Sequence, residues 1–244
     1  MNVGLVIQRG LQGPSVQLGA IGLDVPSVGQ TSSWAGSYHI LQMGRHYDDY
    51  VLTGYTAQFP DIVGLPPAHP YERLTGKIRA SGVSGNVGEC VAALFARRYM
   101  RANIADVIHI RSRQPFVRRK APDYMMRLNS LMPGPFAPIV PPGINWAQPE
   151  LWPVESKARS TGAGAATARR DALAQLAAYW SLLASLRPIE VGYGIVVSFI
   201  YQPPREVRVQ LFLPKDQSGL RSKLATGNAS EIKDARLGAF LHDC

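Results

Sequence analysis

Residues 151–159 read Leu-Trp-Pro-Val-Glu-Ser-Lys-Ala-Arg, and more of the fold can be inferred from them than from any other stretch. The composition of this segment predicts a β-strand. In a strand, residues i and i+2 point to the same face, so Glu155 and Lys157 would reach one site together. Pro153 lacks a backbone N–H, which suits the start or the edge of a strand better than its centre.

A second carboxylate lies earlier in the chain, where Pro122-Asp123 opens a short extended run. Hydrolysis of a phosphodiester requires a hard divalent cation, which neutralises charge on the phosphate and activates a water molecule. Magnesium prefers a site with one or two carboxylates, and an ammonium group beside the water can stabilise the hydroxide. Asp123, Glu155 and Lys157 therefore form a candidate metal-dependent catalytic site.

The segments around these residues alternate between helix and strand. The apolar spacing of residues 88–101 predicts a helix, and that of residues 167–186 predicts a stronger one. Strands are predicted at five further runs: 105–111, 121–128, 151–158, 191–201 and 205–213. This order predicts an α/β core in which a small mixed sheet is flanked by helices.

In its motifs and its element order the chain resembles the PD-(D/E)XK nuclease superfamily, whose restriction-endonuclease-like core runs α-β-β-β-α-β. The resemblance implies a metal-dependent nuclease in which Asp123, Glu155 and Lys157 are catalytic and Mg²⁺ or Mn²⁺ is the cofactor. It also implies that Glu89, at the start of the first helix, is a further catalytic residue. Asp123, Glu155 and Glu89 would then hold the metal.

A second motif is similar to that of the RecB-like branch, which carries Gln-x-x-x-Tyr on the helix after the third strand. The matching residues here are Gln175 and Tyr179, in the run Gln-Leu-Ala-Ala-Tyr. Their i, i+4 spacing places both side chains on one helical face. The resemblance implies that they orient the catalytic lysine or contact the substrate backbone.

We expect the nuclease core to span residues 81–213. Residues 1–80, rich in Gly, Ser, Pro and aromatic residues, are expected to form an irregular or mainly β extension, and residues 214–244 a polar segment with a small helix around 231–241. Asp123 and Glu155 are separated by 31 residues, more than a short hairpin needs, and a Pro-rich insertion at 129–149 accounts for the excess. Because it joins the two metal-bearing strands, we expect it near the cleft. Its Phe136 and Trp146 could stack on unpaired bases or fold back as a hydrophobic plug.

The charge of the chain favours a polyanionic partner. Lysine and arginine number 26 against 17 aspartates and glutamates, for a net charge of +9. Nucleic acid is the first expectation, and DNA is favoured over RNA. Basic residues near the motifs would bind its phosphates: Arg118, Arg119, Lys120 and Arg159. A protein partner or a homo-oligomer stays open.

The number and spacing of the cysteines, and the hydropathy of the chain, indicate the cellular compartment that we expect for the protein. The two cysteines, Cys90 and Cys244, are far apart and form no disulfide framework, which fits a reducing cytoplasm. No stretch approaches the length of a membrane span, so no membrane partner is expected.

Two alternatives compete with an active nuclease. The stretch 161–167, Thr-Gly-Ala-Gly-Ala-Ala-Thr, invites a nucleotide-binding interpretation, but it lacks the three-glycine fingerprint and a Walker lysine. We expect it to be a flexible lead into the following helix. The chain could also keep the nuclease fold and act as a nucleic-acid-binding or assembly subunit of a larger complex.

Overall fold

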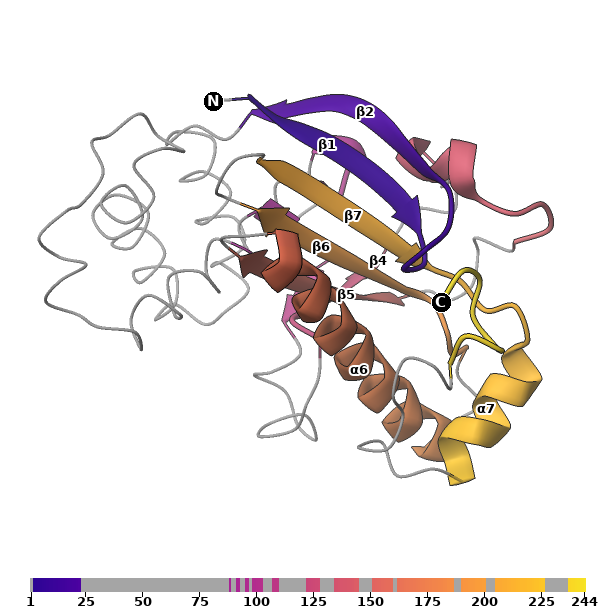
Figure 1. Cartoon of the computed structure of the whole chain (residues 1–244). Helices are drawn as coiled ribbons and strands as arrows, with labels where there is room; N and C mark the ends of the chain where they lie inside the picture. Colours follow the sequence, from indigo (N-terminus) through magenta and orange to yellow (C-terminus); the bar gives the residue numbers. More distant parts are fainter. Residues whose placement is uncertain are drawn as a thin grey trace, which may run out of the picture.

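The computed structural model describes residues 2–22, 122–127, 134–144, 151–159, 162–186, 190–200, 205–226 and 237–244, and parts of the segment 88–109. Within these residues the protein is α/β, with a mixed open sheet and few helices (Figure 1). Among them, no helix is both long and apolar enough to cross a membrane.

The described strands form one seven-stranded sheet in the order β2-β1-β7-β6-β5-β4-β3. Two neighbouring pairs, β1 with β7 and β5 with β6, are parallel, and the other four are antiparallel. The bounds of the strands are β1 (Asn2–Arg9), β2 (Ser15–Gly22), β3 (Val107–His109), β4 (Tyr124–Arg127), β5 (Leu151–Arg159), β6 (Gly194–Ile200) and β7 (Glu206–Phe212). The five strands expected from residue 105 onward are therefore confirmed.

The first two strands extend this sheet beyond the core that we expected. β1 pairs with β7 from Gly4 opposite Glu206 to Arg9 opposite Leu211, and β2 forms the outer edge. Residues 2–22 of the expected N-terminal extension thus belong to the central sheet, because the apolar side chains of β1 are buried on it. Residues 23–80 lie outside the described residues.

The two faces of the sheet are covered differently. Helix α6 (Gly162–Leu186) lies across one of them, here called the α6 face, and α7 (Gln217–Thr226) packs beside it (Figure 1). The opposite face, here called the rear face, carries the larger apolar cluster. The helical residues Val91, Ala92 and Phe95 belong to that cluster, each 1% exposed.

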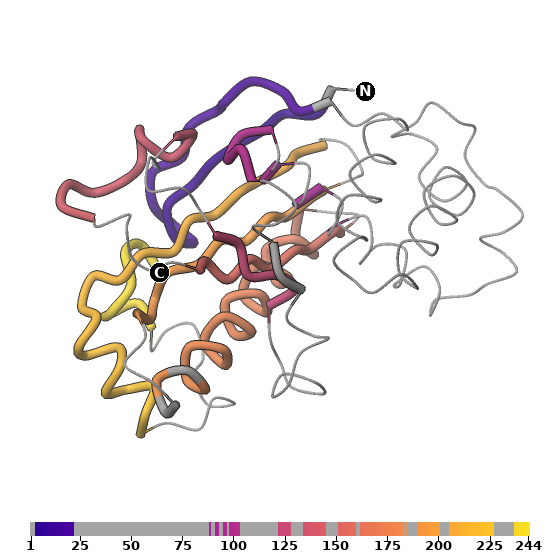
Figure 2. Tube along the Cα trace, turned by 180° about the vertical axis from the view of Figure 1, so that it is seen from behind, coloured from indigo at the N-terminus to yellow at the C-terminus, as the bar shows by residue number. Residues whose placement is uncertain are grey.

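The described part of the insertion lies on the rear face, not beside Glu155 and Lys157 as expected. Its 3-10 helix η3 (Gly134–Ile139) buries Phe136 in the rear cluster, and Nη1 of Arg9 donates to the carbonyl oxygen of Ile139 at 3.1 Å. Figure 2, seen from behind, shows residues 134–144 alongside β1 and β2. Phe136 is fully buried and its ring lies 6.0 Å from that of Phe95, so for Phe136 the plug is correct and base stacking is wrong. Trp146 lies outside the described residues.

The helices differ from expectation in three places. α6 begins at Gly162, so residues 162–166 are helical and not a flexible lead; their three alanines are strong helix formers. α7 was not predicted, although Leu220 and Leu224 are buried at helical spacing. Of the small helix expected around 231–241, residues 237–240 form a turn, and residues 231–236 lie outside the described residues.

Candidate active site

Strand β5 places a carboxylate and an ammonium group side by side. Glu155 and Lys157 both point to the α6 face, and Nζ of Lys157 donates to Oε1 of Glu155. The side chain of Glu155 is fully buried and that of Lys157 is 14% exposed. A buried carboxylate is stable only with compensating groups, so this ion pair is a tightly held unit.

Pro153 fits this strand because of where the pairing with β6 begins. The first residue of β5 that pairs with β6 is Val154, opposite Ile195. Pro153 pairs with Met125 of β4 alone, so at this residue β5 is locally an edge, where proline is tolerated.

Helix α6 supplies a second partner to the lysine. Nζ of Lys157 donates to Oε1 of Gln175 at 2.7 Å. Tyr179, one turn further along α6, is 6% exposed and packs in the apolar cluster of the α6 face, where burial raises its pKa and keeps the phenol protonated. Gln175 therefore contacts the lysine, whereas Tyr179 belongs to the packed interior.

Asp123 immediately precedes β4 and is 2% exposed. Its Oδ2 accepts two hydrogen bonds from Ser156, one from the backbone N–H at 2.9 Å and one from Oγ at 2.7 Å. The last β4–β5 pair in this direction joins Tyr124 to Val154. Beyond that pair, the carboxylate takes the place of a backbone partner at the end of the ladder.

The two carboxylates have different partners. Along β5, Ser156 alternates to the rear face, with Val154 and Ala158, whereas Glu155 points to the α6 face. Asp123 is therefore drawn toward the side of Ser156. Asp123 directly precedes β4, the strand paired with the β5 of Glu155, whereas a position within the strand was expected. Their sharing of one cation stays a prediction.

The donor chemistry of these residues suits a magnesium or manganese ion. Asp123 and Glu155 provide oxygen ligands, which both cations prefer. With Lys157 they place two buried carboxyl groups and an ammonium group on or next to β5. Among the described residues, no group of three or more His, Cys, Asp or Glu side chains is close enough to hold a metal.

The expected third ligand, Glu89, lies outside the described residues, but its neighbour Gly88 is described. A Cβ on Gly88 would lie 3.1 Å from the backbone nitrogen of Ala158 and 3.1 Å from the backbone carbon of Lys157. Gly88 therefore lies close against the backbone of β5 at the lysine, and a larger residue would require the neighbouring backbone to shift slightly.

The expected phosphate-binding residues are only partly described. Arg159, at the end of β5, is exposed, and its Nη1 donates to the carbonyl oxygen of Ala158 at 2.7 Å. Arg118, Arg119 and Lys120 lie outside the described residues.

Ser156 is the site residue that the sequence alone did not single out. Its position between Glu155 and Lys157 was the available signal, because a hydroxyl there faces away from both and toward the end of the neighbouring strand.

Comparisons with known proteins leave the chain without a match. No family model matches it, and no curated protein and no solved structure does so either.

Proposed function

We propose that this protein is a metal-dependent nuclease that hydrolyses phosphodiester bonds, with DNA as the favoured substrate and a PD-(D/E)XK type of core. The observation that carries the proposal is the contact of Lys157 with both Glu155 and Gln175, on β5 next to Ser156, where Asp123 meets the strand. Asp123 and Gln175, which are distant from β5 in the sequence, thus meet this strand at or beside the lysine. The net charge of +9 supports a nucleic-acid substrate.

The residues have separate roles in this proposal. Asp123 and Glu155 would hold Mg²⁺ or Mn²⁺, which when bound supplies charge neutralisation and an activated water. Lys157 stabilises negative charge as it develops at the phosphate. Gln175 is a positioning residue that restricts the ammonium group of Lys157, and Ser156 orients the carboxylate of Asp123.

A second candidate is a nucleic-acid-binding or assembly subunit that has this architecture and no cleavage activity. It is favoured by the hydrogen bonds of Asp123, whose Oδ2 is turned to Ser156 and not to the face of Glu155. In such a protein the three charged groups would serve as a buried structural network.

The test is incubation of the purified protein with supercoiled plasmid, linear duplex DNA and RNA, each with Mg²⁺, Mn²⁺ or EDTA. We expect metal-dependent cleavage that Lys157→Ala and Asp123→Ala abolish, with nucleic-acid binding retained by Lys157→Ala. Nicking of the circular plasmid would identify an endonuclease. Asp171→Asn, which changes an exposed carboxylate on α6, is the matched control and should cleave like wild type.

The outcomes separate the two candidates. Binding without cleavage under every metal condition supports the assembly subunit, whereas cleavage that survives Lys157→Ala would contradict the catalytic role of the lysine. Calorimetric titration with Mn²⁺ adds a readout that is independent of activity. The nuclease should bind the ion, with loss of binding in Asp123→Ala.

A further inference from the structure

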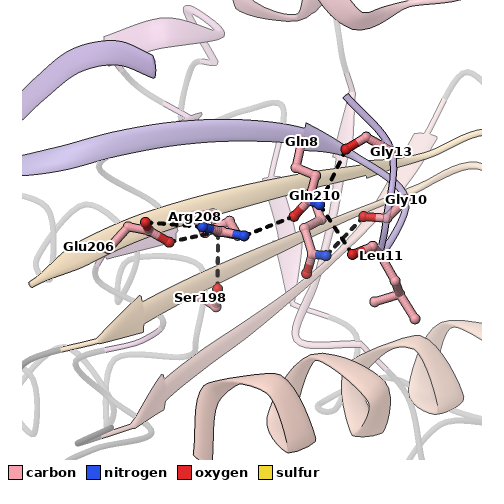
Figure 3. Close-up of polar contacts among 8 residues, drawn as sticks. All are labelled: Gln8, Gly10, Leu11, Gly13, Ser198, Glu206, Arg208 and Gln210. Carbon is pink, nitrogen blue, oxygen red and sulfur yellow. Dashed lines mark hydrogen bonds and ion pairs between the residues drawn. The ribbon is translucent and has the colours of Figure 1, made fainter. Parts of the chain in front are cut away.

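The turn between β1 and β2 is held from the sheet by two glutamines (Figure 3). Gln210 of β7, which is fully buried, donates from Nε2 to the carbonyl oxygen of Gly10 at 2.9 Å. Gln8 of β1 donates from Nε2 to the carbonyl oxygen of Leu11 at 3.1 Å. These carbonyl groups are thus bound by side chains of the sheet, whereas the backbone N–H groups of Leu11 and Gln12 need acceptors from elsewhere.

Those acceptors come from residues 237–244, here called the strap, which are far from the turn in the sequence. The carbonyl oxygen of Asp243 accepts hydrogen bonds from the N–H groups of Leu11 at 2.8 Å and of Gln12 at 3.0 Å. The carboxylate of Asp243 also forms an ion pair with Arg9, the last residue of β1. Asp243 has a φ of 56°, which is uncommon for a residue other than glycine, so these contacts fix an unusual backbone conformation.

The strap is anchored to the core as well as to the turn. Leu237 and Leu241 are 0% and 1% exposed and pack in the apolar cluster of the α6 face. The N–H of His242 donates to the carbonyl oxygen of Leu213, which directly follows β7, at 3.0 Å. The strap, in yellow beside the turn in Figure 1, therefore connects the turn of the hairpin to the core next to β7.

The strap and the turn are in close contact. A Cβ on Gly13 would lie 2.6 Å from the Cβ of Asp243. Gly10 has a φ of 57°, and a Cβ there would collide with the carbonyl oxygens of His242 and Asp243. Separation of the turn from the strap therefore breaks two main-chain hydrogen bonds and the ion pair together.

The β1–β2 hairpin lies at one side of the described sheet, whereas β5 and β6 lie inside it. β1 pairs with β7, and β2 pairs with β1 and forms the outer edge of the described strands. An isolated two-stranded hairpin is at best marginally stable. Parts of a protein with few partners can open while the core stays folded, so contacts at the turn decide how often this hairpin opens.

We propose that the strap is a lock on the β1–β2 hairpin: the hairpin separates from β7 when Asp243 releases its turn, while β5 and β6 stay folded. Opening exposes the edge of β7, whose backbone N–H and carbonyl groups can then pair with another strand. The strap in this way controls access to that edge. The lock concerns the edge of the sheet and does not depend on the proposed nuclease function.

Native-state hydrogen exchange, followed by NMR, tests the lock. The amides of β1 should exchange faster than those of β5 and β6 and with a smaller dependence on urea, because a partial opening exposes less surface than global unfolding. Asp243→Ala should raise the exchange rates of the β1 amides about tenfold, since it removes a charged hydrogen bond. Asp171→Ala, which removes an exposed carboxylate from α6, is the matched control and should leave these rates unchanged.

Two results of this experiment would overturn the proposal. One is a set of β1 amides that match those of β5 in both rate and urea dependence, and the other is β1 amides that do not respond to Asp243→Ala. Arg9→Ala breaks the same ion pair from the side of β1. In that background Asp243→Ala should raise the rates by less than about twofold, because the carboxylate has already lost its partner; a full tenfold increase would also overturn the lock.

A labelled peptide with the sequence of residues 2–9 tests the edge of β7. Its apparent affinity should scale with the fraction of protein whose hairpin is open. Asp243→Ala should therefore bind it about tenfold more tightly than wild type in fluorescence anisotropy, and a peptide of the same composition in scrambled order is the control. Equal binding by the two proteins, or no binding by Asp243→Ala, would overturn the control of this edge by the strap.

Discussion

The substitution Lys157→Met removes one partner of the ion pair between Lys157 and Glu155 on β5. This substitution keeps the length of the side chain and removes its charge, so the fully buried carboxylate of Glu155 loses the ammonium beside it. Gln175 loses its 2.7 Å donor in the same step. Removal of one partner of a buried pair costs about 3–5 kcal/mol, because an uncompensated charge stays in the interior.

A loss of that size is large for a protein of this length. At about 2–4 °C per kcal/mol, the melting temperature should fall by roughly 6–20 °C. Lys215→Met is the matched control. It removes the same charge from an exposed position, where the expected change is within about 0.5 kcal/mol.

Urea denaturation of four proteins tests the pair: wild type, Lys157→Met, Glu155→Gln and the double variant. The double variant should recover most of the stability that Lys157→Met loses, because neither charge is then left alone. A Lys157→Met protein that unfolds at the urea concentration of wild type would refute the reasoning. So would a double variant less stable than Lys157→Met.

Three further substitutions test other contacts. Ser156→Ala removes a hydrogen bond to Asp123 and should weaken Mn²⁺ binding in calorimetry by about 10–100-fold. Ser156→Thr keeps the hydroxyl and should restore Mn²⁺ binding. If the alanine variant binds Mn²⁺ as tightly as wild type, the hydrogen bond is dispensable. Gly88→Ala should lower the free energy of unfolding, measured in urea, by about 1–3 kcal/mol. Gly162 has open space around it, so Gly162→Ala should be neutral or stabilising. Equal effects of the two substitutions would contradict the close approach of Gly88 to β5. Phe136→Ala should lower the free energy of unfolding by about 3–5 kcal/mol in the same assay and leave the affinity for single-stranded DNA unchanged. A loss of that affinity at unchanged stability would contradict the burial of Phe136.

The strands and the long helix between residues 121 and 213 could be predicted because each has its own local signal. The apolar spacing of α6 and the character of β5 depend on neighbouring residues, which the sequence displays directly. The contact between Lys157 and Gln175 could be anticipated because the resemblance to the RecB-like branch implied that a glutamine on this helix orients the lysine.

Other features depend on partners that no local signal reveals. The pairing of β1 with β7 joins segments about 200 residues apart, and nothing within either strand specifies the other. The described part of the insertion, residues 134–144, was misplaced because connectivity fixes only the ends of the insertion, whereas the burial of Phe136 decides on which face this part lies.

The parallel pairing of β1 with β7 also affects how the chain folds during synthesis. At about 5–20 residues per second, β1 leaves the ribosome roughly 10–40 s before its partner strand. An isolated two-stranded hairpin is at best marginally stable, and Leu5 and Ile7, fully buried in the finished sheet, have no rear cluster to enter in that interval. The unpaired edge of β1 is then open to strand addition. The nascent hairpin is therefore the segment at which a chaperone, or a second copy of the chain, has the longest opportunity to bind.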